Sequence, residues 1–253
     1  MNVNTYDHYG YALIALIGTA MAVATIVWLI SHSPWKSKLR ELRGVAPPFI
    51  NILGVLFGLT LAFIANDTWS AHDKATGAVY READALRSLL VLSGKLDEPL
   101  RSTIRATLSR YAQASSEEWD SLAQRRSSPQ ADQQANVLLL AVIDRRIEDQ
   151  LGRTVHALML TKVSDIRHDR DLRIALSQMH VNPLKWLGMA FLGLLTLLSI
   201  AIVHIENPRA AYLSIALFAL SAAPTAAIVL VQGNPFLQPS FVSPAPIIAA
   251  LGP

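Results

Sequence analysis

The sequence predicts an all-α membrane protein with four transmembrane helices and a helical extramembrane domain inserted between the second and third. Three observations support this fold class. Four long apolar runs carry almost no charge. Residues 67–182 hold 16 of the 22 Lys and Arg residues and 16 of the 19 Asp and Glu residues. Apolar residues within that charged region recur at helical spacing. With 52% hydrophobic residues, the chain is too apolar for an ordinary soluble domain.

The membrane spans follow from run length, because about 20 apolar residues are needed to cross about 30 Å of hydrocarbon. One buried soluble helix could explain one such run, but not four of them. Asn182 and Pro183 break the chain before the third run, where Lys185 and Trp186 suit a membrane interface. The predicted spans are residues 11–30, 49–66, 184–204 and 210–232. The chain therefore divides into residues 1–66, the charged domain 67–182, and residues 183–253 with a Pro-rich tail.

Short-loop charge predicts the orientation in a bacterial inner membrane. Residues 31–48 carry four cations against Glu41, and both tails lack Lys and Arg. The four cations are Lys36, Lys38, Arg40 and Arg43. Positive short loops remain in the cytoplasm, so the helical domain is expected in the periplasm. Lys74, Arg81 and the arginines between 167 and 173 favour the opposite placement.

The charged domain is expected to contain four helices. The second span continues as a stem through residue 95, with one apolar face. That face comprises Ala71, Ala75, Val79, Ala83, Leu86 and Leu90. A second helix begins after Asp97-Glu98-Pro99 and passes Trp119 before the loop Arg125–Gln130. A third is expected from about Ala131 to Met159 and a fourth from Thr161 to His180. The tail after residue 232 lies either on the membrane surface or against the helical domain.

Small and polar residues form a stripe on the second span. Asn51, Gly54, Gly58, Ala62 and Asn66 recur at steps of three and four, and Gly54 and Gly58 form a GxxxG pair. Close helix packing explains such a stripe. A pore lining explains it equally, with polar atoms offered to a hydrated ion. In an oligomer, Asp67 would form a ring at the mouth of such a pore, although a solvated carboxylate at the membrane boundary is the simpler alternative.

The sequence contains no motif that indicates catalysis or metal binding. The chain lacks HExxH, phosphate-loop and GxSxG motifs, and it has no cysteine. No cofactor, metal or catalytic residue is predicted, and the protein is not expected to be an enzyme. The net charge of +3 comes from the flanks, so nucleic-acid binding is not expected. The charged run Asp165–Asp171, which includes His168, is expected to form ion pairs on an exposed helix face. Glu117, Glu118 and Asp120 are expected to be solvated.

Several short motifs follow one another in order along nearly the whole chain. The second span contains Phe57-Gly58-Leu59 and Ala62-Phe63, followed by Trp69, and the stem contains Val79, Glu82, Ala83 and Leu86. Arg170 and Arg173 precede Pro183 and Trp186, and an Asn-Pro-Phe then Val-Ser-Pro tail spans 234–244. In their order and spacing these motifs resemble those of the bestrophin-like domain family of membrane proteins. The tail departs from the family pattern at Asn234, where an acidic residue is common.

The resemblance implies a homo-oligomeric ion channel, because bestrophins are oligomers with an axial pore lined by the second span. It makes Phe57, Leu61 and Asn66 candidates for the constriction and the mouth. The expected partners are the lipid bilayer, further copies in a tetramer or pentamer, and small inorganic ions. The alternative is a non-conducting scaffold or sensor whose helical domain binds a protein or small ligand in a pocket between its helices.

Overall fold

The computed structural model describes residues 6–179, 183–238 and 241–252 and contains only helices within them. Four of the described helices are long and apolar enough to cross a membrane: Gly10–Ser31, Ala46–Ser93, Pro183–Val203 and Pro208–Val231. Those helices contain the four predicted spans, apart from a residue or two at their ends. The predicted all-helical class is therefore confirmed, with four candidate membrane-spanning helices. The chain divides into two compact units, which we describe separately.

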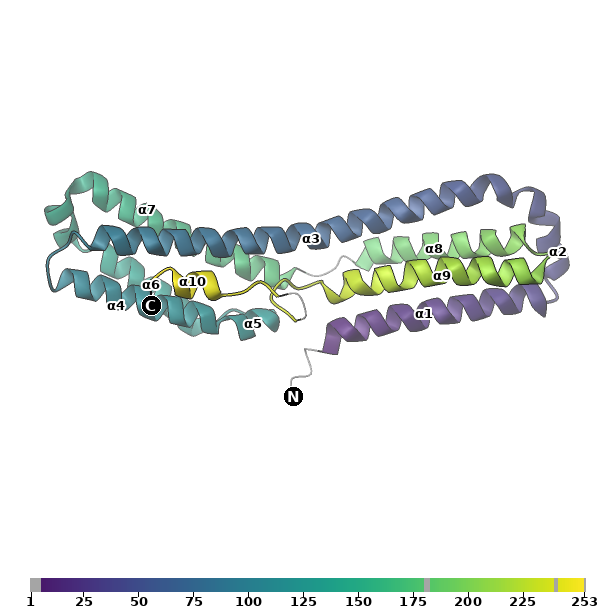
Figure 1. The fold of residues 1–253 in the computed structure, drawn as a ribbon, viewed down its shortest axis with the longest axis horizontal. Coiled ribbons are helices and arrows are strands. Elements are labelled where there is room, and N and C mark those ends of the chain that lie inside the picture. The colour runs from purple at the N-terminus through teal and green to yellow at the C-terminus, as the bar shows by residue number, and fades with distance from the viewer. Residues whose placement is uncertain (1–5, 180–182, 239–240, 253) are drawn as a thin grey trace. The chain divides into compact units, whose positions relative to one another are not determined.

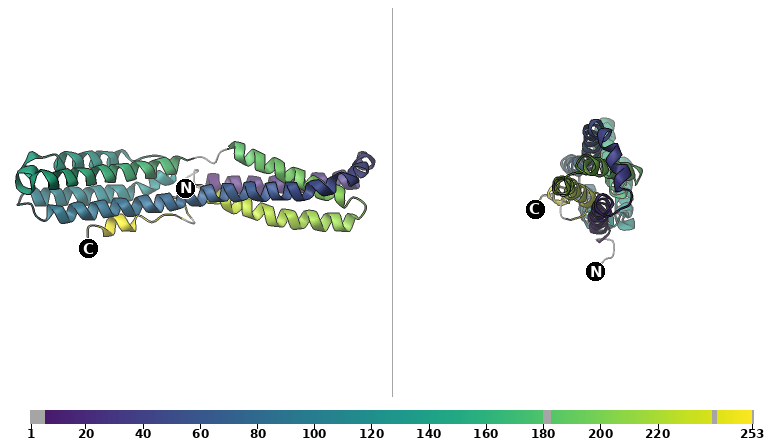
Figure 2. Two further views of the ribbon diagram at one scale, coloured as in Figure 1. Left: turned by 90° about the horizontal axis from the view of Figure 1, so that it is seen from above. Right: turned by 90° about the vertical axis from the view of Figure 1, so that its right-hand side faces the viewer.

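Unit 1 comprises residues Met1–Trp69 and His180–Gly233 and contains the apolar helices. Its elements are α1 (Tyr6–Ser31), α2 (Lys36–Glu41), η2 (Leu42–Gly44), the first part of α3 (Ala46–Ser93), α8 (Pro183–Val203) and α9 (Pro208–Val231). Within this unit α1, α8 and α9 run alongside one another, and α2 lies at one end (Figure 1; Figure 2). Ile26 and Ile30 of α1 pack with Leu197 and Ile215.

Local sequence explains where the helices of unit 1 begin. The Asn207 side chain accepts a hydrogen bond from the Ala210 amide at 3.2 Å, and Pro208 occupies the first turn of α9. Asn is a favoured N-cap residue, and Pro is tolerated at the first helical position because its missing N–H would have no partner there. Pro224 lies inside α9, and the helix continues through it.

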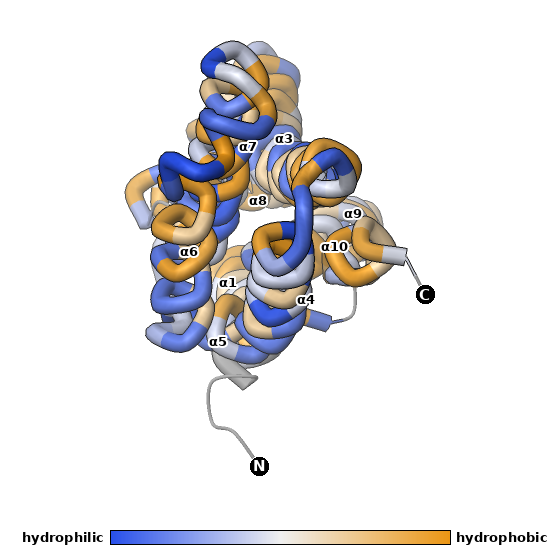
Figure 3. The backbone as a smooth tube through the Cα atoms, turned by 90° about the vertical axis from the view of Figure 1, so that its left-hand side faces the viewer, coloured by the Kyte–Doolittle hydropathy of each residue, from blue (hydrophilic) through white to orange (hydrophobic). Residues whose placement is uncertain are grey.

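Unit 2 comprises residues Ser70–Met179 and Asn234–Pro253. It contains the end of α3, then α4 (Leu100–Glu117), α5 (Trp119–Ala123), α6 (Pro129–Val142), α7 (Arg145–Gln178) and α10 (Ala245–Ala249). The predicted apolar face of the stem is correct, since Ala75, Val79, Ala83 and Leu86 are buried. Hydrophobic and hydrophilic residues alternate around α4, α6 and α7, as expected of amphipathic helices around one core (Figure 3).

Three predicted helix boundaries in unit 2 were wrong. The fourth predicted helix does not begin at Thr161, because α7 extends from Arg145 to Gln178 with no break at that residue. The third predicted helix does not reach Met159, because α6 ends at Val142 and α7 begins at Arg145. Asp144 forms the new start, its carboxylate accepting the Arg146 amide at 2.9 Å. The second predicted helix is also interrupted, at Glu118, between α4 and α5. Residue His180 of the fourth predicted helix lies outside the described residues.

The tail packs against the helical domain, which is the second of the two placements considered. Asn234 donates from Nδ2 to the carbonyl oxygens of Leu122 and Ala123 at 3.1 and 3.3 Å. Its Oδ1 accepts the Phe236 amide at 3.0 Å. Asn234 is therefore buried and fully hydrogen-bonded, and α10 lies beside α4 (Figure 3).

Candidate functional site

The small and polar stripe of α3 lies on the outer surface of unit 1. Asn51, Gly58, Ala62 and Asn66 are exposed, and Gly54 is half-buried. A Cβ atom added at Gly54 or Gly58 would meet nothing within 4 Å, apart from the helix's own backbone. Packing within one chain therefore does not account for the GxxxG pair. The surface is free either for another copy of the chain or for water.

Gly193 on α8 differs from Gly54 and Gly58, because it is closely packed. A Cβ there would lie 3.2 Å from Cε2 of Phe57, so this glycine permits a close approach between α8 and α3. The Phe57 ring also lies 5.2 Å from the Phe218 ring, centroid to centroid. Phe57 thus points into unit 1 and away from the stripe.

Leu61 lies on the same inward side. It is buried in a cluster with Ile64 and Ala65 of α3, Met189 of α8 and Ala226 of α9. The resemblance made Phe57 and Leu61 candidates for the pore constriction, but within unit 1 both are packing residues. Exposed apolar residues beside the stripe include Val55, Leu59 and Phe63.

Asp67 is not an isolated carboxylate. Nζ of Lys185, at the start of α8, lies 2.6 Å from its Oδ2. Trp69 Nε1 donates to Oε1 of Gln232 at 3.2 Å. These two contacts connect α3 to α8 and to the end of α9. Both members of the Asp67–Lys185 pair are more than half exposed, so the pair contributes little to stability. The charge of Lys185 offsets the negative charge that Asp67 was expected to place at a pore mouth.

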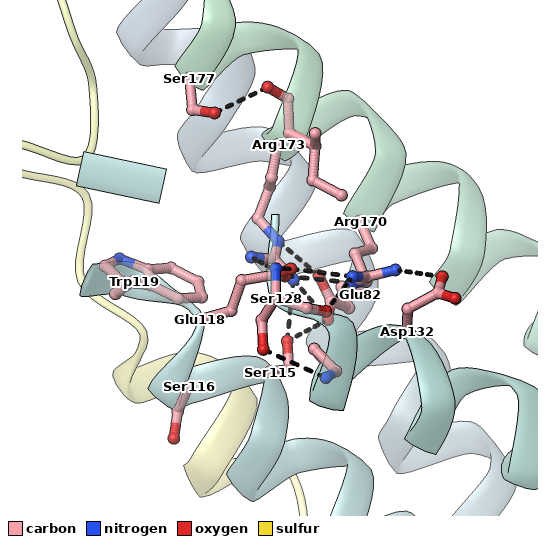
Figure 4. A network of polar contacts seen from close by, with 12 residues as sticks. Glu82, Ser115, Ser116, Glu118, Trp119, Ser128, Asp132, Arg170, Arg173 and Ser177 are labelled. Atoms are coloured by element: carbon pink, nitrogen blue, oxygen red, sulfur yellow. Dashed lines mark hydrogen bonds and ion pairs between the residues drawn. The ribbon is translucent and has the colours of Figure 1, made fainter. Parts of the chain in front are cut away.

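Sequence reasoning missed a buried ion-pair network in unit 2 (Figure 4). Arg173 of α7 and Glu82 of α3 both have fully buried side chains. Arg173 Nε donates to Glu82 Oε2 at 2.8 Å, and Nη2 donates to Oε1 at 3.1 Å. The hydroxyls of Tyr111 and Ser115 donate to the same Oε1 at 2.8 and 2.9 Å. Such bidentate contacts are the strongest Arg–carboxylate geometry.

A second pair lies beside the first. Arg170 Nη2 and Nε donate to the two carboxylate oxygens of Glu118 at 2.8 and 3.1 Å. The Ser128 amide donates to Glu118 Oε1 at 2.9 Å, and Arg170 Nη1 reaches Asp132 at 3.2 Å. Glu118 and Arg173 are also 3.7 Å apart. The network therefore joins α3, α4, α6 and α7 around two guanidinium groups and two buried carboxylates.

These positions correct the prediction of an exposed charged helix. Asp169 and Arg170 are buried, whereas the run Asp165–Asp171 was expected to be exposed, and Arg173 just after the run is buried too. Glu118 is buried too, although its neighbours Glu117 and Asp120 are exposed as predicted. A signal was present in the sequence: Glu82 lies on the apolar face of the stem, between Val79 and Leu86, so a buried cation had to oppose it.

Electrostatics keep the network charged and hydrogen-bonded. Burial raises the pKa of the Tyr111 phenol well above 10, and the negative charge of Glu82 raises it further. The phenol therefore remains a donor to Glu82. Burial alone would lower the pKa of Arg173, but the charges of Glu82 and Glu118, the Tyr111 phenol and the hydrogen bond to Glu82 together outweigh burial, and the pKa is raised. The two guanidinium groups and the two buried carboxylates balance in charge, which indicates a structural role. Only Nη1 of Arg173 among their atoms lacks a hydrogen-bond partner, and it lies 3.7 Å from Oε2 of Glu118.

Trp119 links this network to the tail. The Arg173 guanidinium carbon lies 4.6 Å from the centroid of the Trp119 ring, a cation–π distance. Trp119 Nε1 donates to the Val242 carbonyl at 2.6 Å, and its ring contacts Phe236 edge-on at 5.6 Å. The tail is thus anchored on the residue that covers the buried guanidinium.

Ligand chemistry finds little support elsewhere. A half-open pocket of about 360 Å³ lies between α3 and the tail, lined by His72, Thr76 and Tyr80 on one side and Phe241 and Ser243 on the other. Among the described residues, no group of three or more His, Cys, Asp or Glu side chains could hold a metal ion. None of its lining residues belongs to the buried network, and Pro246 of α10 lines the pocket opposite α3.

Four apolar helices, a charged helical unit and an exposed polar stripe on one spanning helix define an integral membrane protein of bestrophin-like architecture. The chain belongs to the bestrophin-like family, because the Bestrophin-like domain matches residues 17–247. Among curated proteins, no sequence gives a significant match.

Solved structures share the fold. A bacterial bestrophin homologue from Klebsiella pneumoniae, with a tryptophan-to-alanine mutation, superposes with a TM-score of 0.69 at 12% identity, over 98% of this chain and 99% of that one. A variant of the homologue with a leucine-to-threonine mutation gives 0.69 at 14% identity, over 93% and 95%. A membrane protein with a proline-to-alanine mutation gives 0.65 at 12% identity, over 96% and 99%. The fold therefore covers nearly the whole chain.

Proposed function

We propose that this protein is a homo-oligomeric ion channel of the bacterial inner membrane, conducting small inorganic ions passively along an axis lined by α3. Four or five copies would surround the axis. The observation that carries the proposal is the exposed stripe of α3, where a Cβ added at Gly54 or Gly58 would meet no side chain within 4 Å. Membership of the bestrophin-like family supports it, because bestrophins are the channels that this family resembles.

The stripe would provide the polar and narrow parts of the path. Asn51 and Asn66 offer amide oxygens that replace part of an ion's hydration shell. The exposed Val55 and Leu59 are better placed than Phe57 and Leu61 for an apolar constriction, because the latter two pack inside unit 1. Such a constriction gates by dewetting. No cofactor and no catalytic group are required, so the protein is proposed not to be an enzyme.

The test is ion flux from liposomes that contain the purified protein, with Gly58→Leu as the variant. A Leu on each copy would fill the path, so flux should fall at least tenfold while the oligomer elutes unchanged. Gly18→Leu is the matched control, because a Cβ at Gly18 on α1 also meets nothing within 4 Å. It should conduct as the wild type does. Full conduction by Gly58→Leu would refute a path along this stripe.

A scaffold or sensor is the second candidate, and the pocket between α3 and the tail is the observation that favours it. A sensor of this kind would have a closed axis in the oligomer. Absence of flux in the wild-type protein, together with a tightly packed axis in an experimental structure of the assembly, would support this candidate over the channel.

A further inference from the structure

The segment that joins α1 to α3 carries an unusual concentration of positive charge. This interspan segment, residues 32–45, contains the six-residue helix α2 and the short helix η2. Its ends are set by the two spans, because α1 ends at Ser31 and α3 begins at Ala46. Connectivity therefore holds the segment at the surface of the membrane on one side. In unit 1 it lies at the end where α8 turns into α9 (Figure 1).

Charge at this end of unit 1 accounts for the net charge of the whole chain. The interspan segment and residues 204–209 hold five cations and two carboxylates, and the fifth cation is Arg209 at the start of α9. The excess of three equals the formal charge of the chain, +3. The carboxylates are Glu41 and Glu206, and Arg43 forms an ion pair with Glu206. Within the described residues, Lys36, Lys38 and Arg40 form no ion pair. Three cations therefore remain available for a ligand.

Apolar side chains accompany these cations. Trp35 is 65% exposed, Leu42 47% and Val45 56%, and neither α2 nor η2 contains a buried residue. Interfacial segments combine Trp and Leu with Lys and Arg in this way, since the apolar groups enter the boundary of the acyl chains while the cations reach the headgroups. An acidic protein segment would satisfy the charge but would leave the apolar side chains without a partner.

We propose that the interspan segment binds the headgroups of anionic phospholipids through Lys36, Lys38 and Arg40, with Trp35 inserted beside them. Each Lys or Arg near an anionic surface strengthens binding about fivefold at physiological ionic strength. Removal of all three should therefore weaken anionic-lipid binding by roughly 100-fold if the contributions add. Phosphatidylcholine, which has no net charge, would gain little from this surface.

Native mass spectrometry of the intact assembly tests the proposal, with phosphatidylglycerol and phosphatidylcholine as probes. The variant is Lys36→Gln, Lys38→Gln and Arg40→Gln combined. The matched control removes three exposed cations of unit 2 by Lys95→Gln, Arg105→Gln and Arg145→Gln, which changes the charge equally. We expect the wild type and the control to retain phosphatidylglycerol in preference to phosphatidylcholine, and the triple variant to lose that preference.

Three outcomes would overturn the proposal: an unchanged preference in the triple variant, equal retention of the two lipids by the wild type, or full displacement of phosphatidylglycerol by millimolar inorganic phosphate or polyglutamate. If the triple variant fails to assemble, Lys38→Gln and Arg40→Gln tested singly should each lower the preference about fivefold, and no effect in either would also overturn it. The readout does not depend on conduction, so it is separate from the test of the proposed channel.

Discussion

The stability of the interior of unit 2 depends on single residues, because four charged side chains are buried there in one network. Glu82 and Glu118 supply two negative charges, and Arg170 and Arg173 supply two positive ones. Removing an ion from water is costly, and only excellent geometry with additional hydrogen bonds offsets it. Tyr111, Ser115 and the Ser128 amide provide those hydrogen bonds. Each member therefore depends on the others.

Arg173→Met should be strongly destabilising, because it leaves Glu82 buried without its counter-ion. The expected loss is about 3–5 kcal/mol, or roughly 10 °C in the unfolding midpoint for a chain of this size. Differential scanning fluorimetry of the purified protein measures it. Arg153→Met, at a side chain that is 90% exposed, should cost less than about 1 kcal/mol.

The double variant Glu82→Gln, Arg173→Met should recover part of the loss, since no unpaired charge remains. If Arg173→Met unfolded at the same temperature as Arg153→Met, the ion pair would not be important for stability.

Asp144 makes the stability of α7 depend on pH. Side-chain and backbone hydrogen bonds from Arg146 lower the pKa of the Asp144 carboxyl from 3.8 to about 2. A carboxyl with a lowered pKa stabilises the folded state above its unfolded pKa and loses that contribution as the pH falls through the folded pKa. Asp144→Ala should therefore unfold at a lower temperature than the wild type at pH 7.

The difference should shrink as the pH falls from about 4 towards 2, which thermal unfolding in a pH series measures. A difference that stayed constant down to about pH 2 would show that the carboxylate charge is not involved. Asp132→Ala is the control for removing a carboxylate near the start of a helix. Asp132 lies near the start of α6, and its partner is Arg170 and not Arg146.

At the scale of elements, the tail is held by a small number of specific contacts. Asn234 caps the carbonyls at the end of α5, and Trp119 binds the Val242 carbonyl. The tail is further stabilised by the burial of Phe236, Val242 and Ile247 in the hydrophobic core of unit 2. Few contacts per residue make such a segment the first to open locally.

Trp119→Phe should loosen the tail without removing the ring from the core. The loss of one buried hydrogen bond costs about 1 kcal/mol, so amides of residues 242–250 should exchange with deuterium about fivefold faster. Hydrogen–deuterium exchange mass spectrometry measures this rate. Trp69→Phe is the matched control, because it also removes an indole hydrogen bond, here to Gln232 in unit 1. Equal exchange in both variants would exclude Trp119 as the anchor.

At the scale of the whole molecule, four spans require that the interspan segment and unit 2 face opposite sides of the membrane. The chain has no cysteine, so single cysteines can report each side without further substitution. Ser37 and Ser102 are exposed in the two regions. Charge in the short loops predicts that Ser37 is cytoplasmic and Ser102 periplasmic.

Ser37→Cys and Ser102→Cys should react oppositely with a membrane-impermeant maleimide added to intact cells. Labelling of Ser102→Cys alone would support the periplasmic placement, and labelling of Ser37→Cys alone would reverse it. Equal labelling of the two would contradict four spans. Permeabilised cells, in which both cysteines should react, provide the control.

Features that depend on local pattern were predictable from the sequence alone. Apolar runs of about 20 residues defined the spanning helices, and three- and four-residue spacing defined the buried face of the stem, since both depend on backbone geometry that neighbouring residues share. The boundary at Asp144 was missed although its capping chemistry is local, because the dense apolar run before it favoured a continuous helix.

Tertiary structure decided which charges are buried and which residues of α3 face outward. Arg173 and Glu82 are 91 positions apart, so helical periodicity on α7 gave no indication that its charged face would meet a carboxylate from α3. Phe57 and Leu61 lie in the same apolar span as Val55 and Leu59, and only packing against α8 and α9 separates the two sets. Which side chains are buried depends on contacts between segments that are far apart in the sequence. Local sequence patterns carry no information about the energies of those contacts.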